Sequence, residues 1–525
     1  MWLNYIFLVF FLKTTQSGRI LCIYQMPAVS HQATFKPISR ELSLRGHEVI
    51  VVTPHPINDP RFVNLTEIDT SGPTYEIIHR HGFEFFMSKE LPVQSKIPKI
   101  FRMYNEFAHA ILGNEEFRKI YTDESQKFDL IISQIYVSPI MYALSAKLKA
   151  PIIGVSSMGG WTGTHFAIGN HNPPSIYSEM FLPYNGGDLT FYERIKSTLY
   201  YLWTRYYVNF VAMPKWDSIA KQYLGENLPY LADIERNVSA LFLNINAILY
   251  TPRPMVPTVV SLSFMHIQPP KPLPEDIKQE IESSKNGVIY FSLGSNVKSV
   301  NIPEKVRELL MTVFKELPYK VLWKFEKPEL AGKPKNVVIR KWLPQQDVLA
   351  HPKVKVFISQ CGLQSTEEAI AREMPMVGIP FIADQEMNSI RLARWGVLRH
   401  INYLNTTKEE LIGAIKDVAE NPKYKQNMKK LKNLMQDEPM TGLEKAIWWA
   451  EYVIRHKGTK HLRSPTVDIE WYKYLLLDVC AFLLASLICV SFILVKLFKF
   501  MVRKFKRAQD KIKKSDYVPF SNEKK

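Results

Sequence analysis

Residues 19–53 read RILCIYQMPAVSHQATFKPISRELSLRGHEVIVVT, and this stretch decides the fold. It begins with a short apolar run, residues 19–24, and it ends with a second one, residues 47–53. Between them lies a helix-like segment that Gly46 ends. Two buried strands joined by a helix of this length form a βαβ unit of a parallel sheet. The chain is therefore predicted to begin with an α/β domain.

The same pattern recurs along the 525 residues, a length that suits two domains better than one. Further strand-like runs are FDLIIS, PIIGVS, GVIYFSLGS, YKVLWKF, NVVIRKW, VKVFISQ and PMVGIPF. Residues 252–274 carry seven prolines, which disfavour regular structure and predict a semi-rigid connector. We expect two Rossmann-like, doubly wound domains, 18–265 and 266–465, that face each other across a cleft. Neither contains Gly-x-Gly-x-x-Gly, which counts against a nicotinamide or flavin enzyme.

Both ends of the chain carry apolar segments. Residues 1–17 resemble a secretory signal peptide, too short to span a bilayer. Residues 474–495 are long enough to cross the hydrocarbon core as a helix. The tail after them, 496–525, holds eleven Lys or Arg against three acids, and such a flank belongs on the cytosolic side. The domains are therefore predicted to be lumenal, and the tail explains much of the +17 net charge without nucleic-acid binding.

The chemistry-bearing residues outside these segments are sparse. Only four cysteines occur, two of them inside the predicted span, so neither a disulfide framework nor a metal site is expected. The sequence N-x-S/T marks Asn64, Asn237 and Asn405 as candidate glycosylation sites on the lumenal side. Residues 189–210 are rich in aromatic and basic residues. They predict either an interfacial helix on the bilayer or a core-packed helix that caps the acceptor pocket.

Residues 342–396 read WLPQQDVLAHPKVKVFISQCGLQSTEEAIAREMPMVGIPFIADQEMNSIRLARWG. This segment closely resembles the donor-binding signature of the UDP-glycosyltransferase family, as in its membrane-bound animal, insect-type members. Weaker likeness covers nearly the whole chain, including Ser30-His31, FDLII, VIYFSLGS, VLWKF and the apolar segment with its basic tail. The resemblance implies the GT-B fold, which agrees with the two Rossmann-like domains read from the strand pattern.

Each position of the signature has a physical role in binding a UDP-sugar. Trp342 offers a flat face for the uracil ring, and Gln345 offers an amide for the base or ribose. Gly294 and Ser295 follow a predicted strand and can approach a phosphate closely. A helix that begins near the turn Gln360, Gly362, Gln364 and Ser365 would attract the diphosphate with its N-terminus. Glu368 resembles the residue that holds the ribose hydroxyls, and Asp384 and Gln385 resemble the pair that binds the sugar hydroxyls.

The predicted catalytic group is His31, which follows the first strand and resembles the general base of the family. An imidazole can remove the acceptor proton as the hydroxyl attacks the anomeric carbon. In the family an acid supports this histidine, but the corresponding residue here is Gln134. A neutral amide can orient the ring but cannot offset a developing positive charge. Gln360 is a second departure, since the family usually places a histidine there beside the diphosphate.

These features predict an inverting glycosyltransferase that moves a sugar, glucose or a relative, from a UDP-sugar to a small lipophilic acceptor. The UDP-sugar is a co-substrate, and no cofactor or metal is expected. The alternative is a membrane-tethered binding protein that keeps the fold and nucleotide site but has lost efficient catalysis; Gln134 and Gln360 favour it. By family resemblance the protein resides in the endoplasmic reticulum membrane as a single-pass type I protein. Assembly with further copies of itself is left open.

Overall fold

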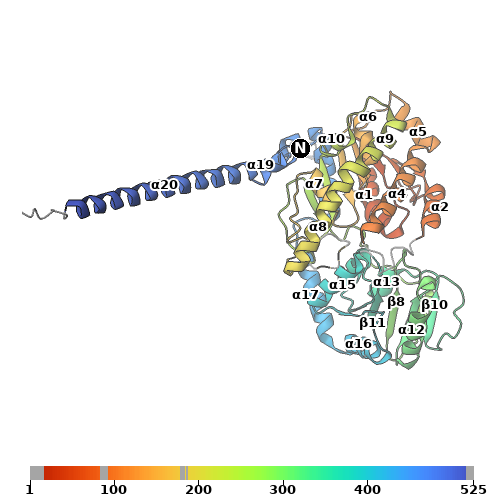
Figure 1. Cartoon of the computed structure of the whole chain (residues 1–525). Helices are drawn as coiled ribbons and strands as arrows, with labels where there is room; N and C mark the ends of the chain where they lie inside the picture. Colours follow the sequence, from red (N-terminus) through yellow and green to blue (C-terminus); the bar gives the residue numbers. More distant parts are fainter. Residues whose placement is uncertain are drawn as a thin grey trace, which may run out of the picture. The chain divides into compact units, whose positions relative to one another are not determined.

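The computed structural model describes residues 17–82, 93–177, 182, 184, 187–382 and 384–515. The predicted signal peptide therefore lies outside the described residues, apart from Ser17. The chain divides into two compact units, one up to residue 464 and one from residue 465 onward. The first unit contains both sheets, which Figure 1 shows in red to yellow and in green to light blue.

The first sheet has seven strands, all parallel, in the order β3-β2-β1-β4-β5-β6-β7. Its strands are β1 (Arg19–Ile23), β2 (Glu48–Thr53), β3 (Leu65–Asp69), β4 (Leu130–Gln134), β5 (Ile152–Ser156), β6 (Ala240–Asn244) and β7 (Val259–Leu262). The βαβ unit predicted at the start of the chain is present as β1, α1 (Val29–Leu44) and β2. The residues 252–274, in which prolines were expected to disfavour regular structure, nevertheless contain β7, which forms in the proline-free stretch between Pro257 and Pro269.

The second sheet has six parallel strands in the order β10-β9-β8-β11-β12-β13. Its strands are β8 (Val288–Ser292), β9 (Lys320–Lys324), β10 (Val337–Arg340), β11 (Val354–Ser359), β12 (Met376–Gly378) and β13 (Leu398–His400). The two sheets confirm the predicted pair of Rossmann-like, doubly wound halves.

Helices cover both faces of each sheet, as the apolar strands require. Helices of the first half are α2 (Ser71–His81), α4 (Val93–Leu112), α5 (Glu115–Thr122), α6 (Ala143–Leu148), α7 (Thr162–Ala167), α8 (Phe191–Tyr207), α9 (Met213–Leu224) and α10 (Leu231–Glu235). Those that follow are α11 (Glu275–Glu282), α12 (Glu304–Glu316), α13 (Gln345–Ala350), α14 (Leu363–Ala371), α15 (Gln385–Arg394), α16 (Lys408–Glu420), α17 (Pro422–Gln436) and α18 (Gly442–His456). On the second sheet, α12 and α16 pack against one face and α14 and α17 against the other.

Helix α18 lies within the range that the sequence assigns to the second domain, yet it packs on the first sheet. Its buried residues Ala446, Ile447 and Ala450 belong to the same apolar core as residues of β1, β4 and α1. After α18, the Thr459 hydroxyl donates a hydrogen bond to the carbonyl of Ser239, just before β6. The chain therefore returns to the first half before it leaves the first unit.

The second unit consists of α19 (Trp471–Tyr474) and the long helix α20 (Leu477–Ser515). Residues 477–514 are long and apolar enough to cross a membrane. The helix begins three residues later than the predicted span, because Leu476 has a left-handed φ of 54° that breaks it from α19. It also continues into the basic tail, which the sequence had set apart from the span.

The tight start of α18 makes its docking testable. A Cβ at Gly442 would lie 2.3 Å from the carbonyl oxygen of Ser263, a backbone atom that cannot rotate away. We expect Gly442→Ala to destabilise the protein by about 1–3 kcal/mol, the usual cost of overpacking. Thermal unfolding of the detergent-solubilised full chain measures this effect. Gly413→Ala in α16 is the matched control: its Cβ meets nothing within 4 Å, and the change should stabilise the helix by about 0.5–1 kcal/mol. Equal effects of the two changes would contradict the docking of α18.

Candidate active site

The strand orders bring the predicted site residues to the carboxyl ends of the strands. In the first sheet β1 lies between β2 and β4, so the loop after β1 leads to His31 next to Gln134 at the end of β4. In the second sheet β8 lies next to β11, so Gly294 and Gln360 follow neighbouring strands. Ligands of doubly wound sheets bind where the strand order reverses in this way.

A cleft of about 370 Å³ lies between the two halves. Nine of the eleven predicted donor residues line it: Gly294, Ser295, Trp342, Gln345, Gln360, Gly362, Gln364, Ser365 and Glu368. From the first half, Val29, Ser30 and Ala33 line the same cleft, at the start of α1. Gln364 joins the two sides, because its amide donates to the carbonyl of Ser157 at 3.0 Å.

Gln345 and Glu368 form the centre of a hydrogen-bond network on the second half. The Gln345 Nε2 donates to Glu368 Oε2 at 2.5 Å and to Ser365 Oγ at 2.9 Å. The Tyr290 hydroxyl donates to Gln345 Oε1 at 3.0 Å, which fixes the orientation of the amide. Each member therefore has its rotamer held by another, and the network presents oxygen acceptors at the predicted place of the ribose.

The turn after β8 approaches Gln360 closely. Gly294 has a φ of 73°, and a Cβ there would lie 2.5 Å from Gln360 Nε2, so a larger residue would strain the backbone and displace this amide. The Gln360 side chain is 6% exposed, and its Oε1 is buried without a hydrogen-bond partner. Gly362 lies immediately before α14, whose first N–H groups have no partner within the helix. Backbone N–H groups and an amide thus meet where the diphosphate was predicted, with no imidazole among them.

Trp342 leaves most of its ring open to the cleft. It is 61% exposed and lines the cleft. Lys324 Nζ lies 5.9 Å from the centre of this ring and donates to the carbonyl of Gly294 at 2.8 Å. An exposed indole of this kind can stack a nucleotide base without moving.

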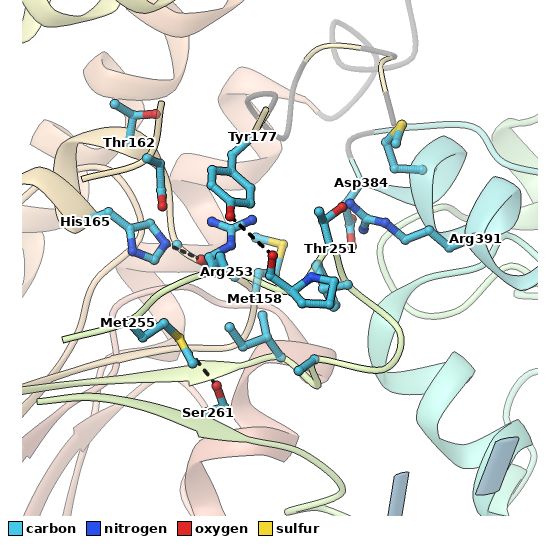
Figure 2. A pocket seen from close by; sticks show the side chains of 18 of the residues that line it. Met158, Thr162, His165, Tyr177, Thr251, Arg253, Met255, Ser261, Asp384 and Arg391 are labelled. Atoms are coloured by element: carbon cyan, nitrogen blue, oxygen red, sulfur yellow. Dashed lines mark hydrogen bonds between the residues drawn. The ribbon is translucent and has the colours of Figure 1, made fainter. Parts of the chain in front are cut away.

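Asp384 and Gln385 lie apart from the other nine predicted donor residues. Asp384 lines a neighbouring pocket between the halves, where it accepts a hydrogen bond from Asn388 and burial raises the pKa of its carboxyl. Figure 2 shows Asp384 and Arg391 entering this pocket from the second half, opposite Arg253. The Gln385 Oε1 accepts from the backbone N–H groups of residues 381 and 382, so it holds a turn.

His31 and Gln134 are adjacent, but the amide presents its donor. Gln134 Oε1 accepts from the Met26 N–H at 2.9 Å, which leaves Nε2 facing His31 Nδ1 at 3.5 Å. A neutral imidazole has one donor and one acceptor nitrogen, so this contact favours the tautomer with the proton on Nε2. Burial of the ring also lowers its pKa to about 4. His31 is therefore neutral near pH 7, with its lone pair directed at Gln134.

Sequence reasoning missed His266 and Gln346. Gln346 Nε2 donates to the carbonyl of His266 and lies 3.4 Å from Glu368 Oε1. The His266 ring lies between Glu367 and Glu368, 3.5 Å from a carboxylate oxygen of each. Burial opposes the charged imidazole, but the two acids outweigh it and raise the pKa of His266. The proline-rich segment and α14 are far apart in sequence, so no local pattern marked this contact.

The remaining predicted sites are compatible with their assignments. Asn64, Asn237 and Asn405 are all exposed, as carbohydrate attachment requires. Cys22 and Cys361 are buried and free. In the described part of the chain no three His, Cys, Asp or Glu side chains gather as a metal-binding group.

Known proteins decide the family. The profile described as "UDP-glucoronosyl and UDP-glucosyl transferase" matches residues 18–512. The chain belongs to this family. Among its relatives, UDP-glycosyltransferase UGT5 of Dactylopius coccus is 32% identical over 92% of both chains. Human UDP-glucuronosyltransferase 2B7 is 31% identical over 92% of this UDP-glycosyltransferase and 93% of its own length.

Solved glycosyltransferases share the GT-B fold. The glycosyltransferase VinC in complex with DTDP has a TM-score of 0.57 at 14% identity, over 83% of this chain and all of its own. A UDP-glucosyltransferase from Polygonum tinctorium has a TM-score of 0.55 at 14% identity, over 84% of this chain and 99% of its own. The fold and the enzyme class predicted from the sequence are confirmed.

The separation of Trp342 from Asp384 predicts that the two residues affect different steps. Trp342→Ala should weaken UDP binding by about 1 kcal/mol, roughly fivefold in Kd, because a stacking face is lost. Asp384→Ala should leave UDP affinity unchanged and impair sugar transfer. Calorimetry with UDP measures the first effect and product formation the second. Trp448→Ala, which removes a partly exposed indole from α18, is the control. Equal losses of UDP affinity in the Trp342 and Asp384 variants would refute this division.

Proposed function

We propose that this UDP-glycosyltransferase transfers a hexose, glucose or a relative, from a UDP-sugar to a small lipophilic acceptor, with inversion at the anomeric carbon. The observation that carries the proposal is the cleft in which nine signature residues of the second half face the start of α1. The exposed indole of Trp342 suits the uracil ring. The fixed Gln345 amide and Glu368 carboxylate suit the ribose, and the backbone N–H groups at the start of α14 suit the diphosphate.

In the proposed reaction the acceptor atom attacks the anomeric carbon and forms the new glycosidic bond. The bond between that carbon and the phosphate oxygen breaks, and UDP leaves with the electron pair. The N–H groups at the start of α14 stabilise the negative charge that develops on the diphosphate. The acceptor proton leaves to His31 or, where the acceptor is already ionised, to solvent before the attack.

The contact between Gln134 and His31 favours acceptors that ionise easily. To act as a base through Nε2, His31 must carry its proton on Nδ1, opposite the N–H donor of Gln134. The resulting imidazolium would then have no carboxylate at position 134 to stabilise it. A weakly acidic alcohol depends on that assistance, whereas an acidic phenol does not. The preferred acceptors are therefore proposed to be acidic phenols or groups of similar pKa.

Gln134→Glu tests this proposal without changing side-chain length. One carboxylate oxygen can still accept from the Met26 N–H, while the other can accept from His31 Nδ1–H and release the Nε2 lone pair. We expect turnover of weakly acidic alcohols to rise about tenfold or more, within the usual contribution of a general base. Turnover of the most acidic phenols should change little. Rates over a series of phenols and alcohols of graded pKa measure the effect.

The pH profile provides an independent readout. A base works only when unprotonated, so activity falls as the pH drops through its pKa. Because the pKa of His31 is about 4, the wild type should lose no activity to His31 protonation between pH 8 and 5. The carboxylate of Gln134→Glu should raise that pKa and move the acid limb upward. His31→Ala is the control; full activity of this variant on every acceptor would exclude His31 as base. A binding protein without catalysis would release no UDP with any acceptor.

We further propose that the protein resides in the endoplasmic reticulum with its first unit in the lumen. The support is α20, whose apolar part is followed by a strongly basic end. In sealed microsomes an added protease should remove only a small C-terminal piece. Treatment with detergent before the protease should expose the whole chain. Digestion of the large unit in intact vesicles would overturn this orientation without affecting the assignment of the cleft.

A further inference from the structure

Helix α8 and the π-helical segment that continues it, Val208–Ala212, expose a continuous apolar face. The helix spacing places residues three and four apart on one side, and the side chains on this side point to solvent. Leu199 is 62% exposed and Phe210 is 70% exposed. The face, called the α8 face below, consists of Phe191, Ile195, Leu199, Leu202, Tyr206 and Phe210. In Figure 1, α8 is the long yellow helix of the first half.

The opposite side of α8 packs on the protein. Ser197, Tyr200 and Thr204 are its buried residues, and Trp203 and Tyr207 pack against the apolar core of the first half. A helix of a soluble domain normally turns one apolar side inward and a polar side outward, whereas α8 also turns an apolar side to solvent. No residue of α8 lines either the donor cleft or the pocket of Figure 2. The sequence left two alternatives for this segment, an interfacial helix and a cap over the acceptor pocket. At these two pockets, α8 does not form a cap.

The charges beside the α8 face favour an anionic surface. Arg194 and Lys196 are exposed at its start. Two acids lie near this start: Asp188 is exposed, and Glu193 already accepts from the backbone N–H and hydroxyl of Thr190 in a capping box. Aromatic and leucine side chains bordered by basic residues are typical of helices that lie in the interfacial region of a bilayer.

The end of the first unit, which leads to the membrane anchor α20, lies near α8. At the end of the first unit, Arg463 donates hydrogen bonds to the Arg236 carbonyl and to Asn237. Arg236 lies close enough to α8 for its charge to act on Arg205. The first unit therefore ends near Arg205, in the last turn of α8. From Arg463 to the start of α20 at Leu477 the chain can extend at most about 50 Å.

We propose that the α8 face lies on the bilayer that α20 spans, with its apolar side chains inserted among the lipid headgroups. The first unit is then held to the membrane at two places, the anchor and α8. This contact involves neither Trp342 nor His31 and stands independently of the proposed function.

Fluorescence quenching by lipids tests this contact in the full-length chain. Cys480→Ser and Cys489→Ser remove the cysteines of α20, while Cys22 and Cys361 are buried. Leu199→Cys then places one label for an environment-sensitive dye on the α8 face. Leu404→Cys is the matched control, since Leu404 is 58% exposed and lies in the second half. Both variants are reconstituted into phosphatidylcholine–phosphatidylserine vesicles that carry a nitroxide lipid near the headgroup.

We expect the nitroxide lipid to quench the label at position 199 at least twice as strongly as the label at position 404. Adding Leu202→Glu to the Leu199→Cys chain should abolish this difference, whereas Leu434→Glu on α17 should not. Equal quenching at 199 and 404 would overturn the proposal. A blue-shifted label at 199 that the lipid does not quench would also overturn it, because a second copy or another protein would then cover the face.

Discussion

The burial of both faces of each sheet is the constraint on which the rest of the structure depends. Parallel strands require crossover helices, and these helices cover the strands on both sides with apolar side chains. Polar side chains can then gather only at the strand ends. In each sheet the reversal of strand order separates two neighbouring loops, β1 from β4 and β8 from β11, and thereby opens space for a ligand. The position of the cleft therefore follows from the packing and strand order of the sheets, and not from any single residue.

Within the cleft the two halves show different degrees of preorganisation. The second half holds Gln345 and Glu368 in a network in which each hydrogen-bonding group has a partner. On the first half, the Met26 N–H fixes Gln134 with its donor toward His31. The second half therefore presents a site whose side chains are already ordered. In the proposed reaction the first half would leave much of the proton transfer to the acceptor itself. The Met26 N–H decides which atom of the Gln134 amide faces the imidazole.

Much of this arrangement could be predicted from the sequence, for identifiable reasons. Strands buried on both faces appear as uninterrupted apolar runs, which is why β1, β2, β8 and β11 were recognised. Strand β13 has only three residues, two of them polar, and carries no such signal. The position of Asp384 away from the other donor residues depends on how the turn before α15 packs. The ion pairs of His266 depend on α14, about a hundred residues later, and no local pattern reports them.

Because α18 returns to the first sheet, the membrane anchor that follows it is attached to the first half. The membrane anchor follows α18, and the residues between them are bonded to Ser239 and Arg236 of the first half. Any pull on the anchor is therefore transmitted to the half that contains His31. Two connecting segments of the chain join the second half to it, one before α11 and one before α18. A movement of one half relative to the other would therefore bend these two connections and would leave the anchor attached to the half that contains His31.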